Sequence, residues 1–305
     1  MRTDKRYNGF LYERRAKKDF LIASHRGAIG AAIADNTIES FDLALLQNTD
    51  ILEMDIAMTT DDELFVIHDG MEPRLLRTDK NVQTMSADEV RQFRCYTVNQ
   101  VVSSQRVPTF DEVLEHLKNK CLINLDRCWI HPDEWKKWGR IIAAIEKHNM
   151  QEQVIFKSPP EEKYRRFFSE LTQPFMYMPM IEEIEDLRPF LNSEINLVAV
   201  EVKFSSDESP LADKTFYDSL HEKSILTWGN AIVLGEEHIL SGGHDDNIAL
   251  LRDPDYGWGW FALNEFDIVQ TDWPLAMSMY FSQKGFRVIS EGIEHGNFTD
   301  NGRLN

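Results

Sequence analysis

The feature that most constrains this sequence is a regular alternation of short β-rich runs with segments of helical periodicity. Eight such pairs follow one another between residues 20 and 283. Strands that alternate with helices throughout predict a parallel sheet with crossover helices. Eight units within about 270 residues favour a (β/α)8 TIM barrel over an open sheet. No glycine-rich nucleotide fingerprint follows any of the runs, which argues against a doubly wound fold.

Apolar and β-branched runs give the expected strands, and apolar residues at helical spacing give the helices. The expected strands are Phe20–Ser24, Ile51–Met58, Cys121–Asp126, Gln153–Phe156, Pro174–Ile181, Leu197–Phe204, Ser224–Trp228 and Asp267–Thr271. The helices that follow them are expected at Asn36–Asn48, Thr109–Lys118, Pro132–His148, Glu161–Leu171, Glu182–Leu191, Leu211–His221, His244–Leu251 and Pro274–Gln283. Glu63–His68 comes directly after turn residues and predicts a short β-hairpin extension after strand 2.

Two further local patterns lie between the hairpin and the third strand. The polar stretch Arg77–Gln105 is expected to hold a short helix at Ser86–Phe93. Thr109 is followed three residues later by Glu112, which matches the capping box that begins many helices.

No internal repeat or low-complexity linker divides the sequence. One domain is therefore expected for residues 1–305, with a core of about 20–288, a lead-in of 1–19 and a tail of 289–305. The first twenty residues carry seven Lys or Arg against three Asp or Glu. They lack the apolar core of a targeting peptide, so the lead-in is expected to be solvated and partly helical.

The overall charge limits the partners of the chain. A formal charge of −18 disfavours nucleic acid, which is bound by clustered Lys and Arg, and disfavours an anionic membrane face. No apolar run has the length of a membrane span, so no stable membrane anchor is expected. A phosphate-bearing small molecule remains possible if a metal ion supplies local positive charge. Cys95, Cys121 and Cys128 show no CxxC spacing, which favours a reduced, cytoplasmic setting. Oligomeric state leaves no trace in the sequence.

Polar side chains gather where the strands end. Active sites of TIM barrels lie at the carboxyl ends of the strands, so these residues are candidates for the chemistry. In chain order they are His25 and Arg26, Glu53 and Asp55, His68 and Asp69, Asp126, Lys157, Glu201 and Lys203, Trp228 and Asn230, and Asp272.

Glu53 and Asp55 are two residues apart on one expected strand, so both side chains point to the same face. Such a pair is commonly solvent-facing or salt-bridged, but here apolar residues alternate with the acids and occupy the other face. The acids are therefore expected to point into the barrel, where two like charges are costly without a cation. Asp126 on the next strand offers a third carboxylate. Oxygen ligands alone favour one hard divalent cation, Mg²⁺ or Ca²⁺, over Zn²⁺.

Several segments match a known family in order and spacing. They are His25-Arg26-Gly27, Asn36-Thr37-Ile38-Glu39-Ser40-Phe41, Glu53-Met54-Asp55-Ile56 with Thr59, Val66-Ile67-His68-Asp69, Leu75-Leu76-Arg77-Thr78, Val107-Pro108-Thr109-Phe110, Thr227-Trp228-Gly229-Asn230 and Gln270-Thr271-Asp272-Trp273-Pro274. Taken together, they resemble the glycerophosphodiester phosphodiesterase family over most of residues 21 to 284. Considered alone, His25 and His68 fit a structural role as well as a catalytic one.

The resemblance implies a role for each matched residue. Glu53 and Asp55 would bind the metal, His25 and His68 would form the acid–base pair, and Arg26 would contact the phosphate. The activity implied is metal-dependent hydrolysis of glycerophosphodiesters to glycerol 3-phosphate and an alcohol. The attacking group in the family is often the neighbouring hydroxyl of the glycerol, which gives a cyclic phosphate that water opens. Which histidine is the base is open, with His25 favoured as base and His68 as acid.

One departure from the family pattern affects the phosphate contact. The family carries a third ligand and a lysine as Glu-x-Lys on one strand, and the matching residues here are Asp126 and Cys128. Asp126 can serve as the ligand, but the lysine is missing. Arg127 is expected to point to the opposite face of the strand. Lys157 is the favoured replacement, although a structural ion pair fits it equally, with Lys203 behind it.

Other readings stay open at this point. Trp228 and Asn230 are candidates for substrate binding. A lysophospholipase D-like or phospholipase-like enzyme on the same barrel, or a non-catalytic barrel that binds phosphodiesters or sugars, would share many of these residues. His244-Asp245-Asp246 could suggest a second metal site, but acids at the start of a helix are more simply explained by the helix dipole.

Overall fold

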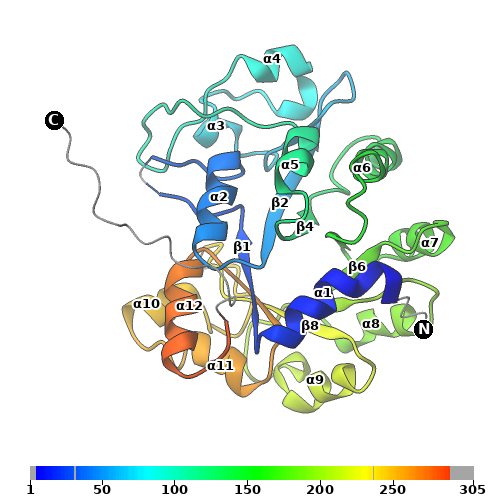
Figure 1. Cartoon of the computed structure of the whole chain (residues 1–305), viewed down its shortest axis with the longest axis vertical. Coiled ribbons are helices and arrows are strands. Elements are labelled where there is room, and N and C mark those ends of the chain that lie inside the picture. Colours follow the sequence, from blue (N-terminus) through cyan, green and yellow to red (C-terminus); the bar gives the residue numbers. More distant parts are fainter. Residues whose placement is uncertain (1–4, 31, 236, 289–305) are drawn as a thin grey trace.

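Eight parallel strands close into a barrel in the computed structural model, which describes residues 5–30, 32–235 and 237–288. β1 pairs with both β9 and β2, which completes the ring and confirms the predicted TIM barrel (Figure 1). The strands are β1 (Leu21–His25), β2 (Ile51–Met58), β4 (Leu122–Asp126), β5 (Val154–Ser158), β6 (Met176–Ile181), β7 (Ala199–Val202), β8 (Leu226–Asn230) and β9 (Ile268–Thr271). The predicted tail at 289–305 lies outside the described residues.

The hairpin after strand 2 is also confirmed. β3 (Leu64–Val66) pairs antiparallel with the end of β2, so that Val66 lies opposite Ile56. Asp62 in the connecting turn has φ of 68°, a left-handed conformation that Asp tolerates better than most residues.

Helices surround the strands on the outside of the barrel. They are α2 (Ile38–Leu46), α5 (Phe110–Leu117), α6 (Glu134–His148), α7 (Glu162–Glu170), α8 (Ile184–Leu191), η2 (Pro210–Ala212), α9 (Lys214–His221), α10 (Asp246–Leu251), α11 (Trp258–Leu263) and α12 (Pro274–Gln283). α5 begins as predicted, because the side chains of Thr109 and Glu112 each accept the backbone N–H of the other. α11 was not predicted, since its sequence is apolar on every side and has no helical period.

Residues 59–108 form a separate layer over one side of the barrel, at the top of Figure 1. This layer contains α3 (Glu72–Leu75), η1 (Val82–Thr84) and α4 (Ala87–Arg91). The sequence predicted a polar stretch with one short helix here. The segment instead builds a small apolar core together with Ala34 and with Ala57 of β2, to which it contributes Phe65, Ile67, Leu75, Leu76, Val82, Met85, Ala87, Val90, Cys95 and Val107.

The two faces of β2 differ as predicted. Leu52, Met54 and Ile56 pack outward in the apolar layer between strands and helices. Glu53 and Asp55 face inward, and each is only 1% exposed. Below them the barrel is filled by side chains rather than hollow: Leu21, Ala23, Ile51, Leu122, Ile155, Met176, Met178, Val198, Ala199, Leu226, Trp228 and Ile268. The carboxylates therefore lie on top of an apolar floor.

The lead-in was predicted to be partly helical and solvated; the helix is confirmed, but the solvation is wrong. It forms α1 (Lys5–Lys17), which lies against the strands near β6 and β8 (Figure 1). Leu11 is fully buried against the apolar filling of the barrel. The side chains of Asn8 and Asn196 exchange two hydrogen bonds of 2.9 and 2.8 Å. α1 thus closes the end of the barrel opposite to the carboxylates.

The basic residues of the lead-in neutralise buried acids at this end. Lys18 lies 2.7 Å from Asp50, and Arg15 lies 2.8 Å from Asp267. Asp50 and Asp267 are both buried and accept backbone N–H groups of neighbouring strands. Packing therefore accounts for the positive charges of Lys18 and Arg15.

Two predictions concern a membrane-spanning segment and the state of the cysteines. Within the described ranges, no helix is both long and apolar enough to cross a membrane. Cys95, Cys121 and Cys128 are free and buried. The cytoplasmic setting stays a prediction.

Candidate active site

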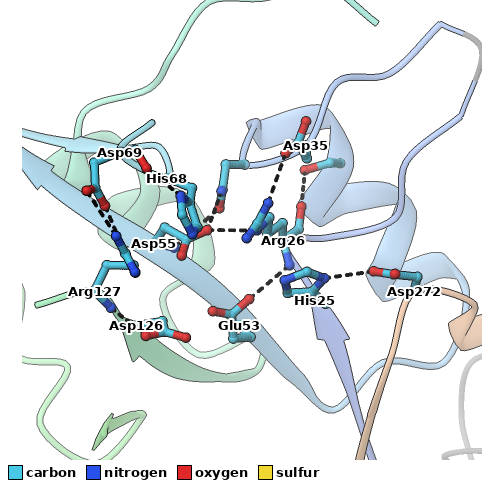
Figure 2. Close-up of polar contacts among 12 residues, drawn as sticks. His25, Arg26, Asp35, Glu53, Asp55, His68, Asp69, Asp126, Arg127 and Asp272 are labelled. Carbon is cyan, nitrogen blue, oxygen red and sulfur yellow. Dashed lines mark hydrogen bonds and ion pairs between the residues drawn. The ribbon is translucent and has the colours of Figure 1, made fainter. Parts of the chain in front are cut away.

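The candidate residues meet at the carboxyl ends of β1, β2 and β4. His25 is the last residue of β1 and lies beside Glu53 of β2, while Asp55 lies beside Asp126 at the end of β4. His68 follows β3, so the hairpin carries it to the same end of the barrel. Figure 2 shows His25 and His68 on either side of Glu53 and Asp55.

Three carboxylates form a group that could hold a metal ion. Glu53, Asp55 and Asp126 offer oxygen atoms that all lie within 4.8 Å of one another. Asp55 Oδ2 also accepts the side-chain N–H of Asn36 at 2.9 Å. The side chains come from adjacent strands at neighbouring register positions, so the barrel itself sets their spacing.

Glu53 shows why a cation fits this group. Its Oε2 accepts the backbone N–H of Arg26 at 3.1 Å, but its Oε1 is buried and has no hydrogen-bond partner among the described residues. Burial, together with the neighbouring Asp55, raises the pKa of Glu53 to about 8. A buried carboxylate oxygen without a partner is unfavourable. A hard divalent cation would satisfy it, and oxygen-only donors are those that Mg²⁺ and Ca²⁺ prefer.

Lys157 enters the same group from β5. Its ammonium lies 2.7 Å from Asp126 Oδ2 and forms a longer ion pair of 3.3 Å with Glu201 Oε2. Burial opposes the charged ammonium, but Asp126 and Glu201 together raise the pKa of Lys157. Burial likewise works against ionised Asp126, and Lys157 lowers the pKa of that carboxyl. A permanent positive charge is thus held in the mouth of the barrel.

The backbone at the end of β4 explains the departure at Cys128. Arg127 has φ of 59°, so the chain turns sharply out of the strand direction there. Cys128 is fully buried in the outer apolar layer instead of the barrel interior. The thiol brings no positive charge to the carboxylates, and Lys157 is a buried cation paired with Asp126.

Arg127 was predicted to point away from the site, and this is wrong. Its guanidinium makes two contacts with Asp69, of 2.8 Å from Nε and 3.0 Å from Nη2 (Figure 2). The prediction assumed that strand alternation continues past Asp126. The left-handed turn at Arg127 ends that alternation and brings the side chain to the rim beside His68.

Each histidine has one ring nitrogen held by an acceptor. His25 Nδ1 lies 2.8 Å from Asp272 Oδ1, and His68 Nδ1 lies 2.7 Å from the backbone oxygen of Asp69. Because both partners only accept, Nδ1 carries the hydrogen in each ring. Burial works against the charged imidazole, but Asp272 raises the pKa of His25. In the neutral rings, Nε2 is then left free to accept a proton.

Arg26 follows His25 directly and has φ of 58°. Its Nε lies 2.9 Å from Asp55 Oδ2 as an ion pair, although the N–H is not aligned for a hydrogen bond. Its Nη1 lies 3.9 Å from Asp35 Oδ2, and Asp35 is also paired with Arg74. The guanidinium is therefore anchored at the carboxylate group.

The other candidates lie at different depths. Asn230 donates a hydrogen bond of 2.9 Å to Glu201, and Trp228 is fully buried beneath it, with its indole N–H shared between Asn230 and Gln270. These two residues support the floor of the site. Lys203 lies at the rim, with its ammonium 2.8 Å from Glu182. A substrate contact of Lys203 stays a prediction.

Sequence reasoning assigned no role to three residues that the structure brings into the site. Asp272 was noted only as a strand-end acid, Asn36 only as part of a motif, and Glu201 only as a polar residue on its strand. The available signal for Asp272 was its position directly after β9. This strand pairs with β1, which ends in His25.

Known proteins resemble this chain in sequence. The sequence profile of the glycerophosphoryl diester phosphodiesterase family matches residues 25–223. A second profile, of a domain of unknown function, matches residues 177–281. The protein YhdW of Bacillus subtilis (strain 168) is 27% identical over 184 residues, which are 56% of this chain and 73% of that protein.

Solved structures share the fold. A glycerophosphoryl diester phosphodiesterase from Parabacteroides distasonis ATCC 8503 superposes with a TM-score of 0.71 at 19% identity, over 94% of this chain and 95% of the other. A phosphodiesterase from Oleispira antarctica, solved in complex with the product sn-glycerol-3-phosphate, gives 0.64 at 16% identity, over 86% and 96%. The family profile covers more than half of the chain. The chain therefore belongs to the glycerophosphoryl diester phosphodiesterase family, whose members are hydrolases of phosphodiesters.

Proposed function

We propose that this chain hydrolyses glycerophosphodiesters to glycerol 3-phosphate and an alcohol, with His25 and His68 as the acid–base pair. The observation that carries the proposal is the arrangement of two imidazoles, each held at Nδ1, on either side of the buried carboxylates of Glu53 and Asp55, with the half-buried Asp126 beside them. Phosphodiester hydrolysis needs a base, an acid and positive charge at one place.

The first requirement of the reaction is positive charge, because a phosphodiester is an anion that repels nucleophiles. Glu53, Asp55 and Asp126 would hold one divalent cation, Mg²⁺ or Ca²⁺, which when bound supplies positive charge to the non-bridging phosphate oxygens. Arg26 and Lys157 contact the same oxygens from the protein side. Lys157 takes the part of the lysine that is missing at Cys128.

Proton transfer is divided between the histidines. His25 Nε2 takes the proton of the attacking hydroxyl, and Asp272 stabilises the imidazolium that results, because a carboxylate faces its Nδ1. The attack gives a cyclic phosphate, which water later opens with the roles of the two histidines reversed. His68, protonated on both ring nitrogens, gives the proton on Nε2 to the leaving oxygen. Its Nδ1 faces only a backbone carbonyl, which supports a positive ring less than a carboxylate does. This difference in partners supports His25 as base and His68 as acid.

The test is a panel of glycerophosphocholine, glycerophosphoethanolamine and lysophosphatidylcholine, each assayed with excess chelator, with Mg²⁺ and with Ca²⁺. Release of glycerol 3-phosphate that the chelator abolishes and one cation restores is the expected result. Glu53→Gln should lose the response to the cation. Release that persists in excess chelator would overturn the metal assignment.

The same panel separates the rival readings. Faster release of lysophosphatidic acid than of glycerol 3-phosphate would assign a lysophospholipase D-like activity. Binding of a glycerophosphodiester without hydrolysis under every condition would assign a non-catalytic barrel and end the proposal.

A further inference from the structure

A buried carboxylate, that of Asp246, lies behind the pair of His25 and Asp272. Asp246 is the first residue of α10 and is only 2% exposed. Its Oδ1 accepts the indole N–H of Trp258 at 2.8 Å and the hydroxyl of Thr271 at 2.7 Å. Its Oδ2 accepts the backbone N–H of Asp272 at 2.9 Å. Three hydrogen bonds therefore converge on one side chain.

Two of the three partners of Asp246 can only donate to it, and the third, a hydroxyl, is placed to donate. An indole N–H and a backbone N–H have no acceptor, and the Thr271 hydroxyl oxygen already accepts the backbone N–H of Trp273 at 2.9 Å. An ionised carboxylate is the group that matches three donors. An amide in either orientation would place its hydrogens against the N–H of Trp258 or of Asp272. Burial works against the ionised form and raises the pKa of Asp246 to about 7, while the three hydrogen bonds act in the opposite direction.

These hydrogen bonds fix the point where β9 ends. Thr271 is the last residue of β9 and lies beside Ser24 of β1. Asp272 follows beyond the sheet, so the hydrogen bond to Asp246 takes the place of a strand pairing for its backbone N–H. The side chain of Asp272 then reaches His25 Nδ1 at 2.8 Å. Asp246 itself is tied to the exit of β8, because its N–H donates to Ala231 at 2.7 Å.

A simple role in starting α10 does not account for Asp246. Asp245 already caps this helix, with its side chain accepting the N–H of Ile248 at 2.8 Å. The side-chain hydrogen bonds of Asp246 go instead to α11 and to the end of β9. The prediction that these acids are helix N-terminal charges is therefore adequate for Asp245 and incomplete for Asp246.

We propose that Asp246 is a positioning residue for catalysis, which holds the backbone of Asp272 so that its carboxylate aligns His25. The inference rests on the proposed function. The side chain of Asp246 has no hydrogen bond to Glu53, Asp55 or Asp126. Its link to His25 therefore runs through Asp272. A small displacement of a catalytic group lowers the chemical rate more than it lowers substrate affinity.

The test is Asp246→Asn, which keeps the size of the side chain. We expect kcat on a cleaved glycerophosphodiester to fall about 10- to 100-fold with KM within about twofold of wild type. The matched control is Asp267→Asn. Asp267 is also a buried Asp, and it directly precedes β9, at the end of that strand opposite to Asp272. The control should lower the melting temperature but leave kcat within about twofold. Equal losses of kcat in both variants would overturn the proposal.

A double-mutant cycle with Asp272→Asn separates positioning from general destabilisation. If Asp246 acts through Asp272, its replacement has no further effect on kcat when Asp272 is already Asn. Losses that multiply would contradict the inference. If Asp246→Asn fails to fold, Thr271→Val removes one donor and should lower kcat about 3- to 10-fold, again only when Asp272 is intact.

A second readout does not depend on turnover. The His25 Nδ1–H proton should give a protected low-field NMR signal that disappears in His25→Ala, and it should be lost or broadened in Asp246→Asn while Asp267→Asn retains it. If the wild-type protein hydrolyses no glycerophosphodiester, the proposed function fails and this signal alone decides the positioning role. An unchanged signal in Asp246→Asn would then overturn it.

Discussion

Arg127 and Asp69 form a two-contact ion pair, with nitrogen–oxygen distances of 2.8 and 3.0 Å, that joins the end of β4 to the loop carrying His68 (Figure 2). Asp69 is also the residue whose backbone oxygen holds His68 Nδ1. Paired arginine and carboxylate groups of this geometry fix orientation as well as distance. The pair therefore connects the carboxylate group to the proposed acid.

Replacing Arg127 should loosen this loop. We expect Arg127→Gln to lower kcat about 10-fold with a small change in KM, because the His68 ring loses its fixed orientation. Arg127→Lys should recover only part of the rate, since an ammonium cannot reproduce the two-contact geometry. Steady-state kinetics of the three proteins check this. Kinetic constants of Arg127→Gln within twofold of wild type would show that the pair is only structural.

Lys157 is expected to act on the substrate as well as on the fold. Lys157→Met should lower kcat/KM about 100-fold, because it removes a buried positive charge beside the phosphate site. The matched control is Lys18→Met, which breaks the buried ion pair with Asp50 at the opposite end of the barrel. Both variants should lose stability, but only Lys157→Met should lose kcat/KM. Similar kinetic losses in both would contradict a phosphate contact.

The sequence was sufficient for the parts that follow from local periodicity. The order of strands and helices, the hairpin and the inward direction of Glu53 and Asp55 depend on alternation along short segments, and the structure agrees with each. The capping box at Thr109 was equally local. These features can be read from spacing because they depend on neighbours in the sequence.

The features that were missed depend on long-range contacts or on one backbone angle. Leu11 is buried because it packs against the open end of the barrel. The weak helical pattern of the lead-in does not reveal this contact. The direction of Arg127 depends on a positive φ at that residue alone. The roles of Asp246 and Asp272 depend on hydrogen bonds between segments far apart in the sequence.

Burial of Leu11 predicts that α1 stabilises the barrel without taking part in chemistry. Leu11→Ala should reduce the free energy of unfolding by about 2 to 5 kcal/mol, as is usual for a buried leucine. Urea denaturation measures this loss, and kcat should stay within twofold. A change in unfolding free energy below about 0.5 kcal/mol would show that α1 does not close the barrel in solution.

The pair of His221 and Asp267 predicts a pH dependence of stability. The hydrogen bond that Asp267 accepts from the His221 ring raises the pKa of His221. The stabilisation is complete below the unfolded pKa of about 6.5 and is lost as pH rises through the higher folded value. Burial opposes ionised Asp267, but His221 and Arg15 lower the pKa of that carboxyl, so its own contribution is lost only in acid.

Between about pH 6 and pH 9, the urea midpoint of wild type should therefore fall more than that of His221→Gln, whose amide does not titrate in this range. Parallel curves for the two proteins would show that the pair is not formed in solution.

The most direct test of the proposed mechanism is the rate of glycerol 3-phosphate release from glycerophosphocholine by wild type and His25→Ala at equal cation concentration. Loss of a general base predicts a fall in kcat of about 100- to 10,000-fold, with the protein folded and the cation still bound. A rate in His25→Ala equal to that of wild type would contradict the assignment of His25 and, with it, the proposed chemistry.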